Sequence, residues 1–80
     1  MDKLDYAVLN VLNEQEANSK LKAISIADIL EELSVNEKTL ARRIKAINEQ
    51  GYIEQGLKVG KAYTYYITES GKNILEEALK

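Results

Sequence analysis

Apolar residues recur at helical spacing in four stretches of the chain, and each stretch predicts one amphipathic helix. The predicted helices cover about residues 3–14, 25–33, 37–50 and 69–80, with polar or charged residues on their opposite faces. Their apolar stripes are Leu4, Val8, Val11 and Leu12; Ile26, Ile29, Leu30 and Leu33; Leu40, Ile44 and Ile47; and Ile74, Leu75, Ala78 and Leu79.

Short polar residues stand where three of these helices begin. Ser25 followed by Asp28 resembles a capping box, Asn36 can cap the third helix with its side-chain carbonyl, and Thr68 can cap the last one. Gly51 can take the left-handed conformation that ends a helix. Because only a tight turn fits between the second and third helices, they predict a helix-turn-helix.

The chain changes to a strand pattern after the third helix. Residues 52–58 and 62–68 are rich in β-branched and aromatic side chains, and Val59 and Gly60 form the tip of a predicted hairpin between them. Gly60 is expected at positive φ. Gly56 weakens the first strand and is compatible with a bulge. Inward positions of the hairpin are predicted at Ile53, Tyr65 and Ile67.

A polar segment precedes the second helix. It leads to a short extended piece at residues 22–24 that can pair at a sheet edge, and no role is predicted for Lys20 and Lys22. Eighty residues make one domain, residues 1–80, near the lower size at which a chain folds unaided. The predicted fold class is α+β, mostly α, with a helix-turn-helix at residues 25–50, a hairpin at 52–68 and a final helix at 69–80.

The third helix carries a cationic face opposite its apolar stripe. Rotating by about 100° per residue brings Lys38, Arg42, Lys45 and Glu49 onto that face. Like charges at these spacings repel by roughly 0.2 to 0.5 kcal/mol per pair, so the stripe makes physical sense where an anion lies against it. The alternative is a solvated face that keeps a small domain soluble.

Charge is segregated along the chain. Residues 34–68 carry a net charge of +3 and the remainder −5, within an overall charge of −2. The chain has no cysteine and no histidine, which removes disulfides, the usual zinc ligands and the usual general base. No membrane span or signal peptide is visible. This inventory fits a cytoplasmic binding module rather than an enzyme, without a cofactor, a metal or an evident small-molecule ligand.

Two motifs resemble the winged-helix family of DNA-binding regulators, of the MarR-like and PadR-like kind. Val35 to Ile44 followed by Asn48 to Ile53 is similar to that family's recognition helix entering its wing strand. Tyr65 to Gly71 is similar to the end of its wing leading into the next helix. The resemblance covers nearly the whole chain and implies a three-helix core, a β-hairpin wing and a C-terminal helix.

The resemblance also implies a function: a sequence-specific regulator of transcription, such as a repressor, that binds double-stranded DNA. Residues 37–50 are then expected in the major groove, with the wing on the adjacent backbone. Arg43 flanks the apolar stripe, so its stem is expected to pack while its guanidinium reaches a phosphate. The implied DNA-binding residues are Asn36, Lys38, Thr39, Arg42, Arg43, Lys45, Lys58 and Lys61.

Three alternatives stay open at this stage. The overall acidity is compatible with a winged-helix protein-interaction module that binds no DNA. Lys58 and Lys61 fit either a phosphate contact or the protection of an exposed strand edge. Regulators of this kind commonly act as dimers, and four residues of the terminal helices can build an interface or simply fill the core: Tyr6, Leu9, Leu75 and Leu79.

Overall fold

The computed structural model describes all 80 residues and contains four α-helices, one short 3-10 turn and a three-stranded sheet. The predicted α+β, mostly helical class is confirmed. In chain order the elements are α1 (Lys3–Glu14), η1 (Lys20–Lys22), β1 (Ile24–Ser25), α2 (Ile26–Glu32), α3 (Glu37–Glu49), β2 (Ile53–Gln55), β3 (Thr64–Ile67) and α4 (Glu69–Ala78).

Side-chain caps fix where the helices begin. The predicted capping box of α2 is present, with the Asp28 amide donating to Ser25 Oγ and the Ser25 amide donating to the Asp28 carboxylate, both at 3.2 Å. The Asn36 side chain accepts from the Lys38 amide at 2.8 Å at the start of α3. Thr68 Oγ1 accepts from the Gly71 amide at 3.1 Å at the start of α4. Each predicted cap is therefore confirmed.

The sheet is antiparallel, with β3 between β1 and β2. Its hairpin has shorter strands than predicted, although Val59 and Ala62 still bridge near the tip and Gly60 has a φ of 61°. Gly56 keeps its ladder bond, with its amide 2.9 Å from the Thr64 carbonyl oxygen. β2 ends one residue earlier, at Gln55, and the Val59–Ala62 bridge is shifted by one residue from the β2–β3 register. The first strand therefore has one extra residue between Gly56 and Val59, and the η1 segment approaches Gly56 closely.

One hydrophobic core joins α1, α3 and the inner face of the sheet. Ile53, Tyr65 and Ile67 lie in it, as predicted. Leu9 and Leu75 are also buried there, at 0% and 3% exposure, so their predicted place in a dimer interface is wrong. Both side chains belong to the single core of this chain, and helical periodicity alone does not indicate which surface covers them.

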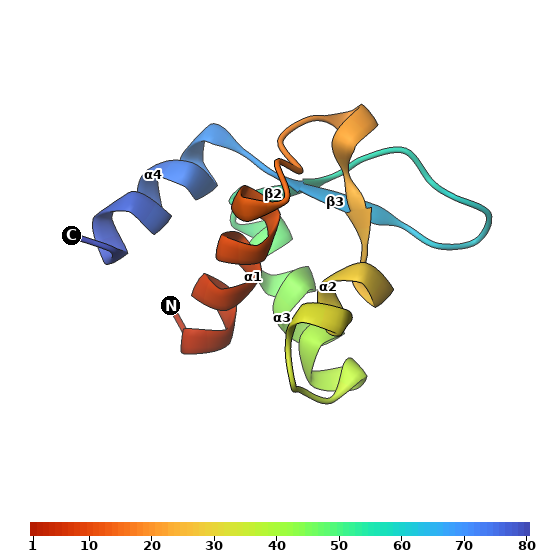
Figure 1. Cartoon of the computed structure of the whole chain (residues 1–80), viewed down its shortest axis with the longest axis horizontal. Helices are drawn as coiled ribbons and strands as arrows, with labels where there is room; N and C mark the ends of the chain where they lie inside the picture. Colours follow the sequence, from red (N-terminus) through yellow and green to blue (C-terminus); the bar gives the residue numbers. More distant parts are fainter.

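α1 occupies the centre of the molecule and contacts α2, α3 and α4. Figure 1 shows α4 at one end and the loop between β2 and β3 projecting from the other. We call residues 56–63 the wing. The described helices include none that is both long and apolar enough to cross a lipid bilayer.

Candidate nucleic-acid interface

The helix α3 presents three cations to solvent. Leu40, Ile44 and Ile47 of α3 are fully or almost fully buried, and this anchors one side of the helix on the core. The intervening positions must then face outward, and Lys38, Arg42 and Lys45 are all exposed. We call these three residues the α3 cationic face.

No acidic side chain forms an ion pair with this face, although Glu49 lies on the same side of α3, four residues after Lys45. The structure contains a single ion pair, and it involves neither Lys38, Arg42 nor Lys45. None of the acids of α2 forms an ion pair with it, and the Asp28 carboxylate accepts the Ser25 amide at the start of its own helix. The positive charge of α3 is therefore available to an external anion.

Arg43 lies apart from the other α3 cations. Its Nε and Nη2 donate to Asp5 Oδ1 and Oδ2 at 2.8 Å and 2.7 Å, a bidentate pair. Asp5 is fully buried, whereas the Arg43 side chain is 31% exposed. The predicted guanidinium–phosphate contact is replaced by this contact with α1, which sequence spacing could not indicate because 38 residues separate the partners.

The pairing shifts the pKa of both groups. Burial alone would raise the pKa of Asp5, but hydrogen bonds from Arg43 and from the Asp2 amide outweigh burial and lower it. The hydrogen bonds to Asp5 raise the pKa of Arg43. Asp5 therefore stays ionised while buried, and it holds α3 against α1.

The start of α3 lies at the surface. Asn36 and Thr39 are both exposed. The Asn36 carbonyl oxygen is occupied as the helix cap, so its amide group is the part that remains free to donate to a ligand. Glu37 adds a carboxylate to the same turn, on the flank that faces the wing.

The wing supplies a second group of cations. Lys58 and Lys61 are exposed, and Lys58 Nζ lies 4.9 Å from the centre of the Tyr63 ring, within the range of a cation–π contact. Tyr63 is 49% exposed and was not predicted as a site residue. The only sequence feature that indicates Tyr63 is its spacing from Tyr65. The two residues are two positions apart, so their side chains point to the same side of the extended chain and line the same cleft.

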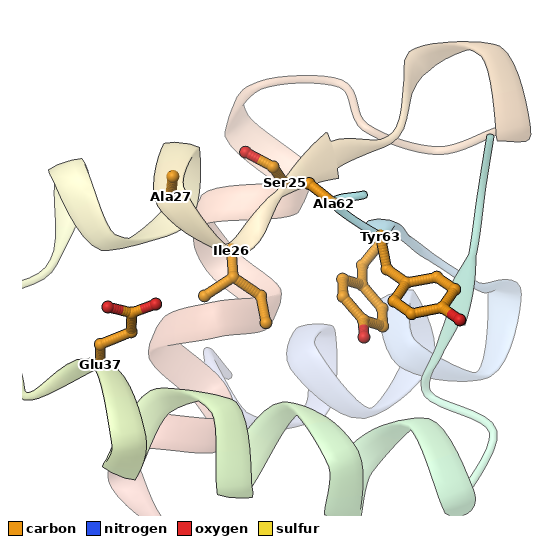
Figure 2. Close-up of a pocket in the computed structure, with 7 residues that line it drawn as sticks. Ser25, Ile26, Ala27, Glu37, Ala62 and Tyr63 are labelled. Atoms are coloured by element: carbon orange, nitrogen blue, oxygen red, sulfur yellow. The ribbon is translucent and has the colours of Figure 1, made fainter. Parts of the chain in front are cut away.

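A cleft of about 270 Å³ separates the wing from the helix-turn-helix. Figure 2 shows the Glu37 carboxylate on one side of the cleft, Tyr63 on the other and Ile26 between them. Its lining is mostly apolar: Ser25, Ile26, Ala27, Glu37, Ala62, Tyr63 and Tyr65. The cations of α3 and of the wing therefore form two separate groups on either side of an apolar gap.

No protein-family model matches the chain, whereas individual relatives do. It is 30% identical over 71 residues to the DNA-binding protein TubR of Clostridium botulinum C phage, covering 89% of this chain and 88% of the relative. It is 33% identical over 78 residues to the DNA-binding protein TubR of Priestia megaterium, covering 94% and 73%.

The chain is also similar to solved structures of DNA-binding proteins and of a transcriptional regulator. TubR from Bacillus megaterium pBM400 superposes with a TM-score of 0.89 and 25% identity, over 99% of this chain and 87% of the other. The DNA-binding TubR fragment from Clostridium botulinum has a TM-score of 0.77 and 28% identity, over 98% and 96%. The transcriptional regulator SlyA has a TM-score of 0.72 and 26% identity, over 99% and 52%.

Proposed function

The chain belongs to the TubR family of DNA-binding proteins, and from that premise we propose that it binds double-stranded DNA through the α3 cationic face. The observation that carries the proposal is that Lys38, Arg42 and Lys45 are exposed together and have no acidic partner. Phosphate contacts by such cations supply much of the affinity of DNA-binding proteins.

The helical form of α3 supports its placement in the major groove. An α-helix fits that groove, and an arginine at its centre can donate two hydrogen bonds to a guanine edge. Arg42 has this role in the proposal, with Lys38 and Lys45 on the phosphates beside it. Asn36 and Thr39 contact phosphate or base edges at the helix start, and Lys58 and Lys61 contact the neighbouring backbone. Arg43 is left out of this set because Asp5 already holds its guanidinium.

The same proposal includes a regulatory role. We propose a cytoplasmic repressor of transcription that acts as a homodimer, since one short helix with few base-reading side chains gives limited specificity alone. Of the four residues predicted for the interface, Tyr6 and Leu79 keep exposed surface and stay in the proposal.

Selection of bound duplexes from a random pool, at two salt concentrations, tests this function. An enriched motif whose affinity falls steeply with salt is the expected result. On that motif Arg42→Ala should weaken binding by about 1 to 3 kcal/mol, roughly 5- to 150-fold, with unchanged thermal stability. Lys3→Ala, which removes an exposed cation from α1, is the matched control and should bind normally.

Two outcomes would contradict the proposal. Equal affinity of wild type and Arg42→Ala for the selected duplex would show that α3 does not recognise the bases of the motif. Absence of any salt-sensitive duplex binding would instead favour the protein-interaction module, for which the net charge of −2 is the supporting observation.

A further inference from the structure

Two lysines of η1 lie beside the base of the wing, although they precede it by 34 or more positions in the sequence. The Leu57 amide donates to the Lys20 carbonyl oxygen at 3.4 Å, and η1 packs against β3. Figure 1 shows the orange η1 turn next to the start of the wing loop. Lys20 and Lys22 therefore lie beside the base of the wing, whose loop carries Lys58 and Lys61.

Gly56 makes this approach sterically feasible. A Cβ atom at Gly56 would lie 2.4 Å from the Ala23 Cβ and 2.9 Å from the Lys20 carbonyl oxygen, closer than real Cβ atoms come to other atoms. The glycine in the wing therefore serves a close contact between two segments. Thr64 lies beneath the same contact, 4% exposed, with its hydroxyl donating to the Leu57 carbonyl.

The lysines of this region have no acidic partners. Lys20, Lys22, Lys58 and Lys61 are all exposed, and none takes part in an ion pair. Glu54, the acid of β2, accepts a hydrogen bond from the Tyr66 hydroxyl at 2.6 Å. We call these four lysines the η1–wing surface.

The η1 segment packs on the face of the sheet opposite the core, whereas Lys58 lies against Tyr63 on the side of the cleft. Alternate residues of a strand point to opposite faces. Tyr65 and Ile67 enter the core together with residues of α3, whereas Thr64 points toward Gly56 and the η1 segment. A duplex held by α3 must therefore continue past the wing in order to meet Lys20 and Lys22.

We propose that the η1–wing surface binds the phosphate backbone of duplex DNA that flanks the segment contacted by α3. This inference rests on the proposed function and extends its contact area beyond α3 and the wing tip. Duplex DNA is the occupant that the charges favour, because its negative charge runs continuously from one group of cations to the next. An acidic polypeptide is the competing occupant.

Salt-dependent binding to duplexes of two lengths tests the inference. The probes are the selected motif in a duplex of about 20 base pairs and the same motif extended by about one helical turn on each side. For wild type, the slope of log affinity against log salt should be steeper on the long duplex. In the variant Lys20→Gln/Lys22→Gln that slope should fall by about 2 on the long duplex and stay unchanged on the short one.

The matched control is Lys3→Gln/Lys80→Gln, which removes the same charge from exposed positions on α1 and at the C-terminus. It should retain the wild-type slope on both duplexes. A Lys20→Gln/Lys22→Gln slope equal to wild type on the long duplex, or a control slope that falls equally, would overturn the inference while leaving α3 binding intact. Failure of wild type to bind the short duplex would instead overturn the proposed function and the inference with it.

Discussion

The carboxylate of Asp5 joins two helices that are distant in the sequence. It accepts the Asp2 amide at 3.1 Å as part of the α1 cap, and it accepts both donors of Arg43 from α3. Successive helical residues are rotated by about 100°, so directing Arg43 toward α1 turns Arg42 outward. The buried pair thus fixes the rotation of α3 that presents its cationic face.

Removing this charge should destabilise the fold in a pH-dependent way. We expect Asp5→Asn to lower the free energy of unfolding by about 2 kcal/mol at neutral pH, because the partly exposed Arg43 guanidinium loses its charged partner. The pKa of Asp5 is lower in the folded chain than in the unfolded one, so its contribution is complete above the ordinary carboxyl range. That contribution disappears as the pH falls through the folded pKa.

Denaturant unfolding at about pH 7 and about pH 2 measures the effect. The difference between wild type and Asp5→Asn should be large at neutral pH and should close in acid. Glu31→Gln, an exposed carboxylate change on α2, is the control and should show neither effect. Equal stability of Asp5→Asn and wild type at neutral pH would contradict the role given to the pair.

At the scale of elements, one hydroxyl connects the end of α3 to the start of α4. Thr68 Oγ1 donates to the Gly51 carbonyl oxygen at 2.6 Å and accepts from the Gly71 amide at 3.1 Å. Gly71 then packs directly on Tyr52, where a Cβ would lie 2.2 Å from the carbonyl oxygen. Glycine is a poor helix former in the first turn of a helix, and this close approach explains why α4 has one there.

Thr68→Val should therefore lower the free energy of unfolding by about 1 to 2 kcal/mol, since it keeps the shape of the side chain but removes the cap. Thr68→Ser retains the hydroxyl and should lose much less. Thermal unfolding of the two variants provides the comparison. If valine and serine proved equally stable at this position, the two hydrogen bonds would have no net stabilising effect.

The elements were predictable to the extent that their signals are local. Ser25, Asn36 and Thr68 bond to amides two or three residues away, so their caps could be read from the sequence. The Asp5–Arg43 pair depends instead on how α1 crosses α3. The role of Gly56 likewise depends on a segment more than 30 residues earlier, and a conformational signal such as a bulge was the only explanation that sequence offered.

Candidate site residues follow the same division. Periodicity placed Lys38, Arg42 and Lys45 opposite the apolar stripe of α3, and the structure has them exposed. Periodicity could not decide whether apolar residues on α1 and α4 cover each other or a second copy. In the structure, Leu9 and Leu75 are both buried in the core of one chain.

For the whole molecule, segregated charge makes approach to DNA depend on orientation. The net charge is −2, yet the acids of α2 and α4 lie outside the α3 cationic face and the wing. Long-range attraction is therefore weak, and productive contact needs the cationic side turned toward the duplex. Binding should accordingly depend more on close phosphate contacts than on steering from a distance.

Because one short helix makes few contacts with DNA, we expect a second copy of the chain to supply another recognition helix. We expect the two copies to meet at the exposed surface of α4. Leu79 is 72% exposed directly after α4, and Tyr6 on the adjoining helix α1 is half-buried, so both can contribute apolar surface to a partner. We expect wild type to sediment as a dimer at micromolar concentration and Leu79→Lys to sediment as a monomer with unchanged thermal stability. Leu21→Lys, which changes a leucine that is 85% exposed on η1, should remain dimeric.

Wild type that sediments as a monomer would leave each α3 to bind alone, and the selected DNA motif should then be a single half-site rather than two half-sites about one helical turn apart.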